Sequence, residues 1–175
     1  PLQKEAPQES MHVLEPDIEN IRRAWQTGLA EQNVDLLTNA LTSLSIYYQL
    51  RGLAHEGEQV IHSTLCTAKA WARAGIPLAT RAGLERARFQ NRLGQYRLAM
   101  KTLQTALKLA DQCEDRWAEG MGHMLWGESL WRLGQYDPSK EQLTHALDIG
   151  NVINATQIIG WSHHQLGIIH DIQGH

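Results

Sequence analysis

Histidine has the widest chemistry of the residues in this chain, and three of the nine histidines, His163, His164 and His170, are close together in the sequence. Imidazole nitrogens can bind Zn²⁺, but helical zinc sites use an HExxH spacing, whereas this stretch has the spacing HHx5H. His163 and His170 can share a helix face, yet no carboxylate or cysteine completes a set of ligands. We therefore expect packed or solvated histidines, with no metal ion and no other cofactor.

The sequence also lacks the sets of residues that nucleophilic or acid–base catalysis needs. Cys66 and Cys113 have no recognisable base in the sequence, and the chain contains neither G-x-S-x-G nor a G-x-x-x-x-G-K-[ST] phosphate loop. The adjacent carboxylates Glu114 and Asp115 fall in a predicted loop, where helix capping is their commoner role. We predict that the chain is not an enzyme. Two cysteines without a CxxC spacing also suit a reducing compartment, which predicts a cytoplasmic location.

A row of arginines offers the clearest binding chemistry. Arg81, Arg88 and Arg92 follow one another at helical spacings, so one helix face carries all three. Like charges in such a row repel by roughly a few tenths of a kcal/mol per pair, and an anionic partner would offset that cost. Guanidinium groups bind carboxylates, and Trp131 would supply a stacking surface. A solvated arginine face and a tryptophan packed in the core are the alternatives.

The composition narrows the range of partners. The chain has 16 lysines and arginines against 19 aspartates and glutamates, whereas nucleic-acid-binding domains usually have a strongly basic balance. No apolar run approaches the roughly 18 residues that a membrane-spanning helix needs. We therefore predict neither direct nucleic-acid binding nor a membrane segment.

Helices are the elements that must position these residues. From Ile18 onward, apolar residues return at three- and four-residue spacings, without strand-like alternation. Pro77 suits the first turn of a helix, where its missing N–H costs nothing, and Asn33 suits a helix cap. The pattern predicts an all-α chain with helices near residues 17–31, 34–51, 54–73, 77–93, 96–112, 115–133, 136–148 and 153–172.

A repeat of about 40 residues organises these helices, because RLGQY occurs at residues 92–96 and again at 132–136. The anchoring turn residues are Gly52, Gly94, Gly134 and Gly174. Small residues lie at fixed distances from them: Ser45, Ala87, Gly127 and Gly167 before, and Gly57, Ala99 and Ser139 after. A small residue on each of two helices lets their backbones approach closely. The spacing therefore predicts tandem helical hairpins.

This pattern resembles the tetratricopeptide repeat, which has a small residue before a G-x-Y turn and A-x3-F/L-x2-A after it. The matching residues are Gly127, Gly134-Gln135-Tyr136, Ser139, Leu143 and Ala146, and in the preceding copy Ala87, Gly94-Gln95-Tyr96, Ala99, Leu103 and Ala106. Arg86 departs from the pattern, which expects a large apolar residue there. The resemblance covers residues 34–175, with an incomplete last repeat, and implies antiparallel hairpins in a right-handed superhelical solenoid.

The resemblance also implies where a partner would bind, because the first helix of each hairpin lines a concave face. The first repeat places Thr42, Ile46, Gln49 and Leu50 there, the second and third add Leu84 and Met121, and the last adds Ile168 and Asp171. The predicted partner-binding groove comprises Arg81, Arg88, Asn91, Arg92, Met124, Glu128, Trp131, Arg132, Trp161 and His164. Its expected occupant is a protein, a peptide or a small effector, and a surface that only packs remains the alternative.

A second resemblance involves the residues that precede and open the repeats. The segment is similar to the one that opens the helical repeats of bacterial signal-transducing (STAND-type) ATPases and related transcriptional activators, through Asn20, Arg22, Ala24, Trp25, Arg51-Gly52 and Glu56-Gly57. It implies a piece of a larger protein whose ATPase lies elsewhere. We divide the chain into a linker at residues 1–14, a leading helix at 15–33 and repeats at 34–175.

Two functions remain open at this point. One is a non-catalytic protein-interaction or ligand-sensing module of a larger signalling or regulatory protein, in contact with neighbouring domains. The other is a structural scaffold or oligomerisation arm without a ligand of its own. An incomplete last repeat would leave Ile168, Ile169 and Ile172 partly exposed, which predicts self-association through that repeat.

Overall fold

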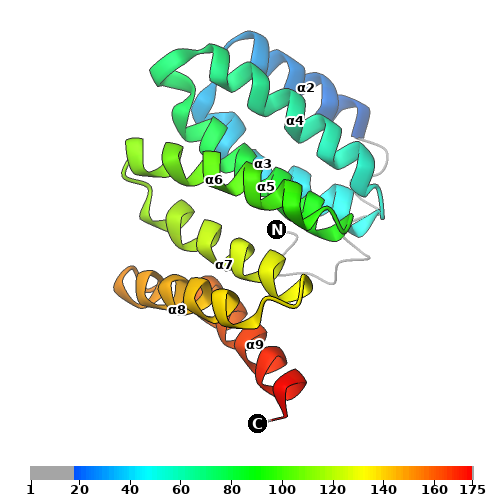
Figure 1. Cartoon of the computed structure of the whole chain (residues 1–175). Coiled ribbons are helices and arrows are strands. Elements are labelled where there is room, and N and C mark those ends of the chain that lie inside the picture. The colour runs from blue at the N-terminus through cyan, green and yellow to red at the C-terminus, as the bar shows by residue number, and fades with distance from the viewer. Residues whose placement is uncertain (1–17, 175) are drawn as a thin grey trace.

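The computed structural model describes residues 18–174, and over that range its regular elements are all helical (Figure 1). The helices are α2 (Ile18–Ala30), α3 (Val34–Leu50), α4 (Ala54–Ala70), the short 3-10 helix η1 (Ala72–Gly75), α5 (Ile76–Arg92), α6 (Tyr96–Gln112), α7 (Arg116–Arg132), α8 (Tyr136–Val152) and α9 (Thr156–Gln173). The predicted all-α class is confirmed. The linker predicted at 1–14 lies outside the described residues.

The helices form a stack of antiparallel hairpins, α3 with α4, α5 with α6 and α7 with α8, and α9 follows as the next first helix (Figure 1). The first helices also contact one another, α3 with α5, α5 with α7 and α7 with α9. The predicted solenoid of tandem hairpins is therefore confirmed. None of the helices within residues 18–174 combines the length and the apolar character needed to cross a membrane.

Each turn of the stack contains a residue in the left-handed backbone region. Inside the hairpins this residue is the repeat glycine, as at Gly94 and Gly134, where φ is 73° and 74°. Glycine adopts this conformation without the steric penalty of a Cβ atom, so the repeated RLGQY stretch marks the turn. Between hairpins the same region is occupied by side-chain-bearing residues, namely Gln32, Ala72, Glu114 and Asn154.

Helix starts follow the local sequence. The Asn33 side chain accepts a hydrogen bond from the Leu36 N–H at 3.2 Å and caps α3, as predicted. Pro77 lies in the first turn of α5, where the helix makes no use of its missing N–H. Asp115 caps α7 by accepting a hydrogen bond from the Ala118 N–H at 2.9 Å. The Glu114–Asp115 pair therefore includes a helix cap.

The small residues allow close contact between the two helices of a hairpin. A Cβ atom on Gly127 of α7 would lie 2.7 Å from two side-chain carbons of Leu143 on α8, which is fully buried. The Ser139 hydroxyl donates a hydrogen bond of 2.7 Å to the Gly127 carbonyl, again from α8 to α7. A larger residue at position 127 would force these helices apart.

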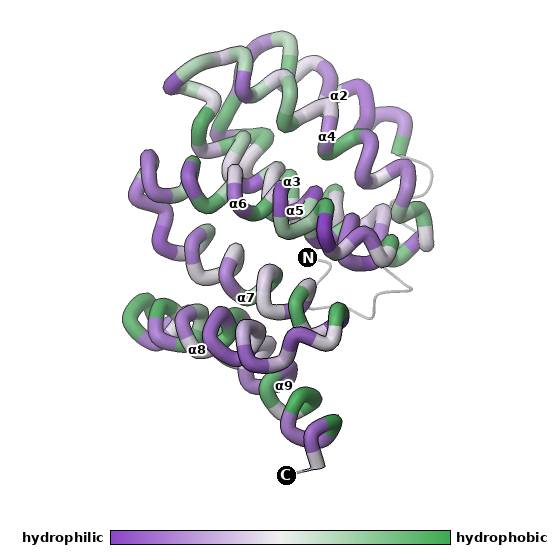
Figure 2. The backbone as a smooth tube through the Cα atoms, in the orientation of Figure 1, coloured by the Kyte–Doolittle hydropathy of each residue, from purple (hydrophilic) through white to green (hydrophobic). Residues whose placement is uncertain are grey.

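The apolar core runs along the stack in two clusters, one from Trp25 to Phe89 and one from Leu84 to Ile169. Figure 2 shows hydrophilic and hydrophobic residues alternating along the helices, as expected where one side of each helix packs. Arg86, which departs from the repeat pattern, is accommodated because its Nε donates to a Glu58 oxygen at 2.7 Å and both side chains are largely buried. A polar pair here takes the place of an apolar contact.

The last helix is partly buried. Ile169 is fully buried, which contradicts the expectation that it would be partly exposed, because it packs into the second core cluster. Ile172 is half exposed, as predicted, and Trp161 is exposed to a similar extent. Helix α9 is thus fixed to the stack by one side and offers apolar atoms on another.

Candidate functional site

A groove with a volume of about 390 Å³ crosses the first helices of the repeats, α3, α5, α7 and α9. Its walls mix basic, aromatic, amide and apolar side chains, and they comprise Thr42, Ile46, Gln49, Arg88, Arg92, Met124, Leu125, Glu128, Trp131, Arg132, Gln157, Trp161, His164, Gln165 and Ile168. The stacking of hairpins brings these residues together from four helices. We call this surface the concave groove.

Of the ten residues predicted for the partner-binding groove, all but Arg81 and Asn91 line this surface. Of the other residues predicted on the concave face, Leu50, Leu84, Met121 and Asp171 are not part of the lining, and Leu84 and Met121 are buried. The sequence prediction missed Leu125, Gln157 and Gln165. Two of these could have been found, because Leu125 lies nine residues before Gly134 (134 minus 125) and Gln165 nine before Gly174 (174 minus 165). Residues nine before the turn glycine on these two helices therefore belong to the lining.

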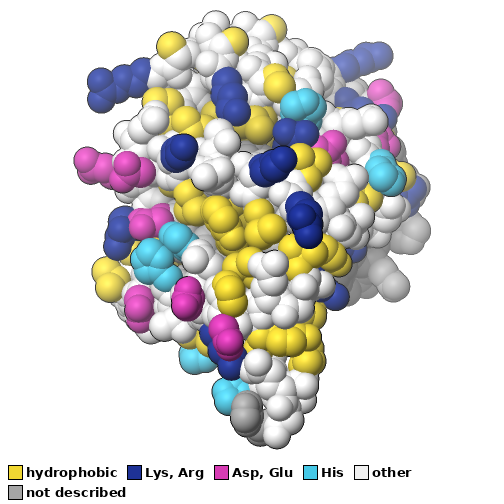
Figure 3. Space-filling model, viewed as in Figure 1, with side chains coloured by type: hydrophobic (Ala, Val, Ile, Leu, Met, Phe, Trp, Pro, Cys, Tyr) yellow, Lys and Arg dark blue, Asp and Glu magenta, His cyan; other side chains and the backbone are white. Residues whose placement is uncertain are grey.

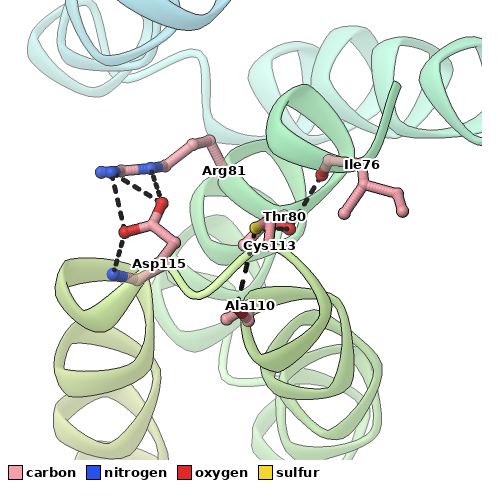
Figure 4. A network of polar contacts seen from close by, with 7 residues as sticks. Ile76, Thr80, Arg81, Ala110, Cys113 and Asp115 are labelled. Carbon is pink, nitrogen blue, oxygen red and sulfur yellow. Dashed lines mark hydrogen bonds and ion pairs between the residues drawn. The ribbon is translucent and has the colours of Figure 1, made fainter. Parts of the chain in front are cut away.

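Arg81 lies outside the groove and forms an ion pair that links two successive hairpins. Its Nε and a terminal nitrogen donate to the two Asp115 oxygens at 2.9 and 3.1 Å, and its guanidinium carbon lies 4.0 Å from the centre of a Trp117 ring. Figure 4 shows Arg81 of α5 pointing toward Asp115 at the start of α7. The prediction of Arg81 as a groove residue is therefore corrected, because this guanidinium is bound inside the chain.

Asn91 is buried beneath the groove. Its amide nitrogen donates to the Leu125 carbonyl at 3.2 Å and reaches a Glu128 oxygen at 3.5 Å, while its amide oxygen accepts from the Ser129 hydroxyl at 2.8 Å. These bonds join α5 to α7 and hold Glu128 in place. Asn91 therefore supports the groove, and its prediction as a lining residue is corrected.

The repulsion predicted within the arginine row is largely relieved inside the chain. Arg88 donates to both oxygens of Glu85 at 3.0 and 3.1 Å, and Arg81 is paired with Asp115. Burial raises the pKa of Glu85 above its ordinary value, while the Arg88 guanidinium acts in the opposite direction. Of the row, Arg92 is the exposed member for which residues 18–174 supply no hydrogen bond or ion pair.

The groove is basic on balance, because Arg88, Arg92 and Arg132 line it together with one carboxylate, Glu128. Burial raises the pKa of Glu128, and the nearby guanidinium of Arg132 lowers it to a smaller extent. The Arg132 guanidinium also covers Trp131, with its central carbon 4.2 Å from the ring centre. Figure 3 shows one face of the molecule, on which basic and acidic side chains are both spread over several helices.

Three lining side chains carry buried polar atoms without a hydrogen-bond partner among the described residues: Gln49 Nε2, Trp131 Nε1 and Gln165 Oε1. Buried polar atoms normally find partners, since leaving one unpaired costs about 1–3 kcal/mol. At the other end of the groove, Trp161 is 53% exposed and meets His164 edge to face, with ring centres 5.8 Å apart. The three unpaired atoms lie buried in the walls of the groove, and the Trp161 ring is its accessible aromatic surface.

No family model matches this chain. The curated proteins likewise contain no match to it.

Proposed function

We propose that the chain is a non-catalytic binding module that holds an acidic segment of a protein, or an acidic small effector, in the concave groove. The observation that supports this most strongly is the combination of exposed Arg92 with the exposed Trp161 ring in one concavity. Arginine forms paired hydrogen bonds with carboxylates, and an exposed aromatic ring packs against apolar groups of the same partner. An acidic peptide would match both groups.

Apolar side chains of the same partner would complete the fit. Met124, Ile46 and the exposed ring of Trp161 lie in the same groove as the arginines. Burying such surfaces contributes roughly 25 cal/mol per Å² of apolar area. The preferred partner is therefore a segment in which acidic and apolar residues alternate or adjoin.

We further propose that this module belongs to a larger signalling or regulatory protein of the cytoplasm. What supports this proposal is that the residues from Asn20 to Trp25 and from Arg51 to Gly57 resemble the segment that opens the helical repeats of signal-transducing ATPases. Both Cys66 and Cys113 are free thiols, which fits a reducing compartment. In this setting, occupation of the groove would report the presence of an effector to neighbouring domains.

The direct experiment is selection of peptides from a displayed random library on the purified protein. We expect enrichment of peptides that combine aspartate or glutamate with apolar residues. Replacing Arg92 with alanine should weaken the selected peptides at least about tenfold, since a hydrogen bond to a charged group contributes about 1.5–3 kcal/mol. Binding would be measured by fluorescence anisotropy.

Arg97→Ala is the matched control, because Arg97 is also exposed but lies on α6, outside the groove. It should leave the affinity unchanged. Selection without any enrichment would favour the alternative function, a scaffold or oligomerisation arm. Equal losses in Arg92→Ala and Arg97→Ala would show non-specific attraction by positive charge and would contradict the proposal.

A further inference from the structure

Two histidines and a carboxylate converge between α7 and α8, away from the concave groove. Glu119 and His123 lie one turn apart on α7, and His145 faces them from α8. The ligand atoms of these three side chains all lie within 4.8 Å of one another, and the two imidazole ring centres are 4.2 Å apart. Figure 3 shows histidine side chains beside acidic and basic ones at the level of α7 and α8.

The hairpin itself explains why these residues meet. His123 precedes the turn glycine Gly134 by eleven residues (134 minus 123), and His145 follows it by eleven (145 minus 134). Residues equally distant from the turn of an antiparallel hairpin lie at the same level. Glu119, four residues before His123, lies on the same helix face.

A hydrogen bond orients the partly buried histidine. His123 Nδ1 lies 2.8 Å from the Gln142 side-chain oxygen, which can only accept, so Nδ1 carries the proton. The lone pair of Nε2 is then left for another partner. Metal-binding histidines are commonly held in this way, with one ring nitrogen donating and the other coordinating. Burial also lowers the pKa of His123, which favours the neutral imidazole.

The Glu119 carboxylate already forms an ion pair with a neighbouring cation, Arg116. Arg116 donates to Glu119 Oε2 at 2.6 Å, which leaves Oε1 available. Because Arg116 is exposed, its side chain can move aside when another positive charge approaches. The ion pair is therefore a competitor that lowers the affinity of the cluster for a cation.

We propose that Glu119, His123 and His145 form a binding site for a divalent transition metal of the Zn²⁺ class. Two imidazoles and one carboxylate are a ligand set that proteins use for zinc, with an open fourth position for water or a further ligand. Ligand atoms around tetrahedral zinc are about 3.4 Å apart, given bonds of about 2.0–2.1 Å, so modest side-chain rotations would close the present spacing. A bound ion would link α7 to α8 near the middle of their hairpin.

The test is titration of the purified protein with Zn²⁺ in competition with a chromophoric chelator, repeated with Co²⁺ to read its visible absorption. We expect one saturable site and the intense bands of four-coordinate Co²⁺. His145→Ala, which replaces an exposed side chain, should weaken Zn²⁺ binding by at least about tenfold, and Gln142→Leu should do so by about tenfold through loss of orientation of His123.

The matched control is His163→Ala, which removes an exposed histidine of α9 outside this cluster. It should leave the affinity unchanged, whereas Arg116→Ala should raise it by removing the competing cation. Absence of saturable binding, or equal affinity in the parent protein and His145→Ala, would overturn the proposal. Circular dichroism melts would verify that each variant is folded.

Discussion

Helices α7 and α9 occupy equivalent places in successive repeats, since α7 begins at Arg116 and α9 at Thr156, forty residues later (156 minus 116). Gly127 of α7 is pressed against Leu143, whereas a Cβ atom on its equivalent, Gly167, would meet no described atom within 4 Å. The same small residue is thus a tight contact where the described residues include the second helix of its hairpin, α8, and an open position where residues 18–174 contain no such helix. A small residue in the repeat motif allows a second helix to pack closely at that position. Whether such a contact stabilises the fold depends on which side chains lie opposite the small residue.

The two helices also differ at their starts. Asp115 caps α7 and is tied to Arg81 of the previous hairpin, whereas Ala155 gives α9 no side-chain cap. Helix α7 is therefore fixed by a cap, an ion pair and close packing. Helix α9 has the same backbone with fewer of these interactions, which predicts lower local stability.

The largest expected effect is that of Gly127→Leu, which forces a bulky side chain against Leu143. Overpacking of this kind costs roughly 1–3 kcal/mol in the free energy of unfolding. Gly167→Leu should be neutral or stabilising by up to about 1 kcal/mol, because leucine has a higher helix propensity than glycine. Urea unfolding of both variants measures the difference. Equal losses would show that the two positions have similar surroundings.

A smaller effect is expected from exchanging the caps. Asp115→Ala should destabilise the protein by about 0.5–2 kcal/mol for the lost cap, with an added loss from the unpaired Arg81 guanidinium. Ala155→Asp should stabilise α9 by supplying the missing cap. Hydrogen exchange of the first-turn amides in each helix would check both changes. Slower exchange in α9 only after Ala155→Asp would confirm that its start lacks a side-chain cap.

The smallest effect concerns a carboxylate present in α7 and absent from α9, where Ile168 takes the place of Glu128 (168 minus 128 is the repeat length of 40). Burial raises the folded-state pKa of Glu128 above its ordinary value of 4.5. The folded state therefore binds the proton more tightly than the unfolded state. This contribution to stability falls as pH rises from 4.5 through the raised folded pKa.

Glu128→Gln removes this dependence. We expect the free energy of unfolding of the variant, relative to that of the parent protein, to increase as the pH rises from 4.5 through the raised folded pKa of Glu128. Glu141→Gln, at an exposed position of α8, is the control. A relative stability that does not change with pH would show that Glu128 is not penalised by burial.

Much of the fold was predictable because helical repeats encode it locally. Periodic apolar residues indicated the helices, Asn33 and Pro77 indicated helix starts, and the repeated glycines indicated the turns inside hairpins. The turns between hairpins gave no such signal, since Gln32 and Asn154 adopt the left-handed region without being glycine. The left-handed residues of these turns are exposed, and backbone hydrogen bonds at the helix ends close the turns, such as the one from the Asn33 N–H to the Gly28 carbonyl at 2.9 Å.

The groove was less predictable than the fold. Periodicity gives the face on which a residue lies, but its partner in the next hairpin depends on the helix crossing and on side-chain rotamers. Arg81 and Asn91 show this, because each bonds to a residue 34 positions later and is removed from the groove by that bond. The cluster of Glu119, His123 and His145 has no signal in the sequence, because His145 meets the other two side chains only through the hairpin.

The most direct test of the concave groove as the binding surface uses the indole N–H signals of the six tryptophans. Trp131 and Trp161 line the groove, whereas Trp25 packs in the first cluster with its N–H bonded to Thr64 at 3.1 Å. During an NMR titration with a selected acidic peptide, we expect the signals of Trp131 and Trp161 to move and that of Trp25 to stay. Movement of the Trp25 signal with unchanged Trp131 and Trp161 would contradict the account.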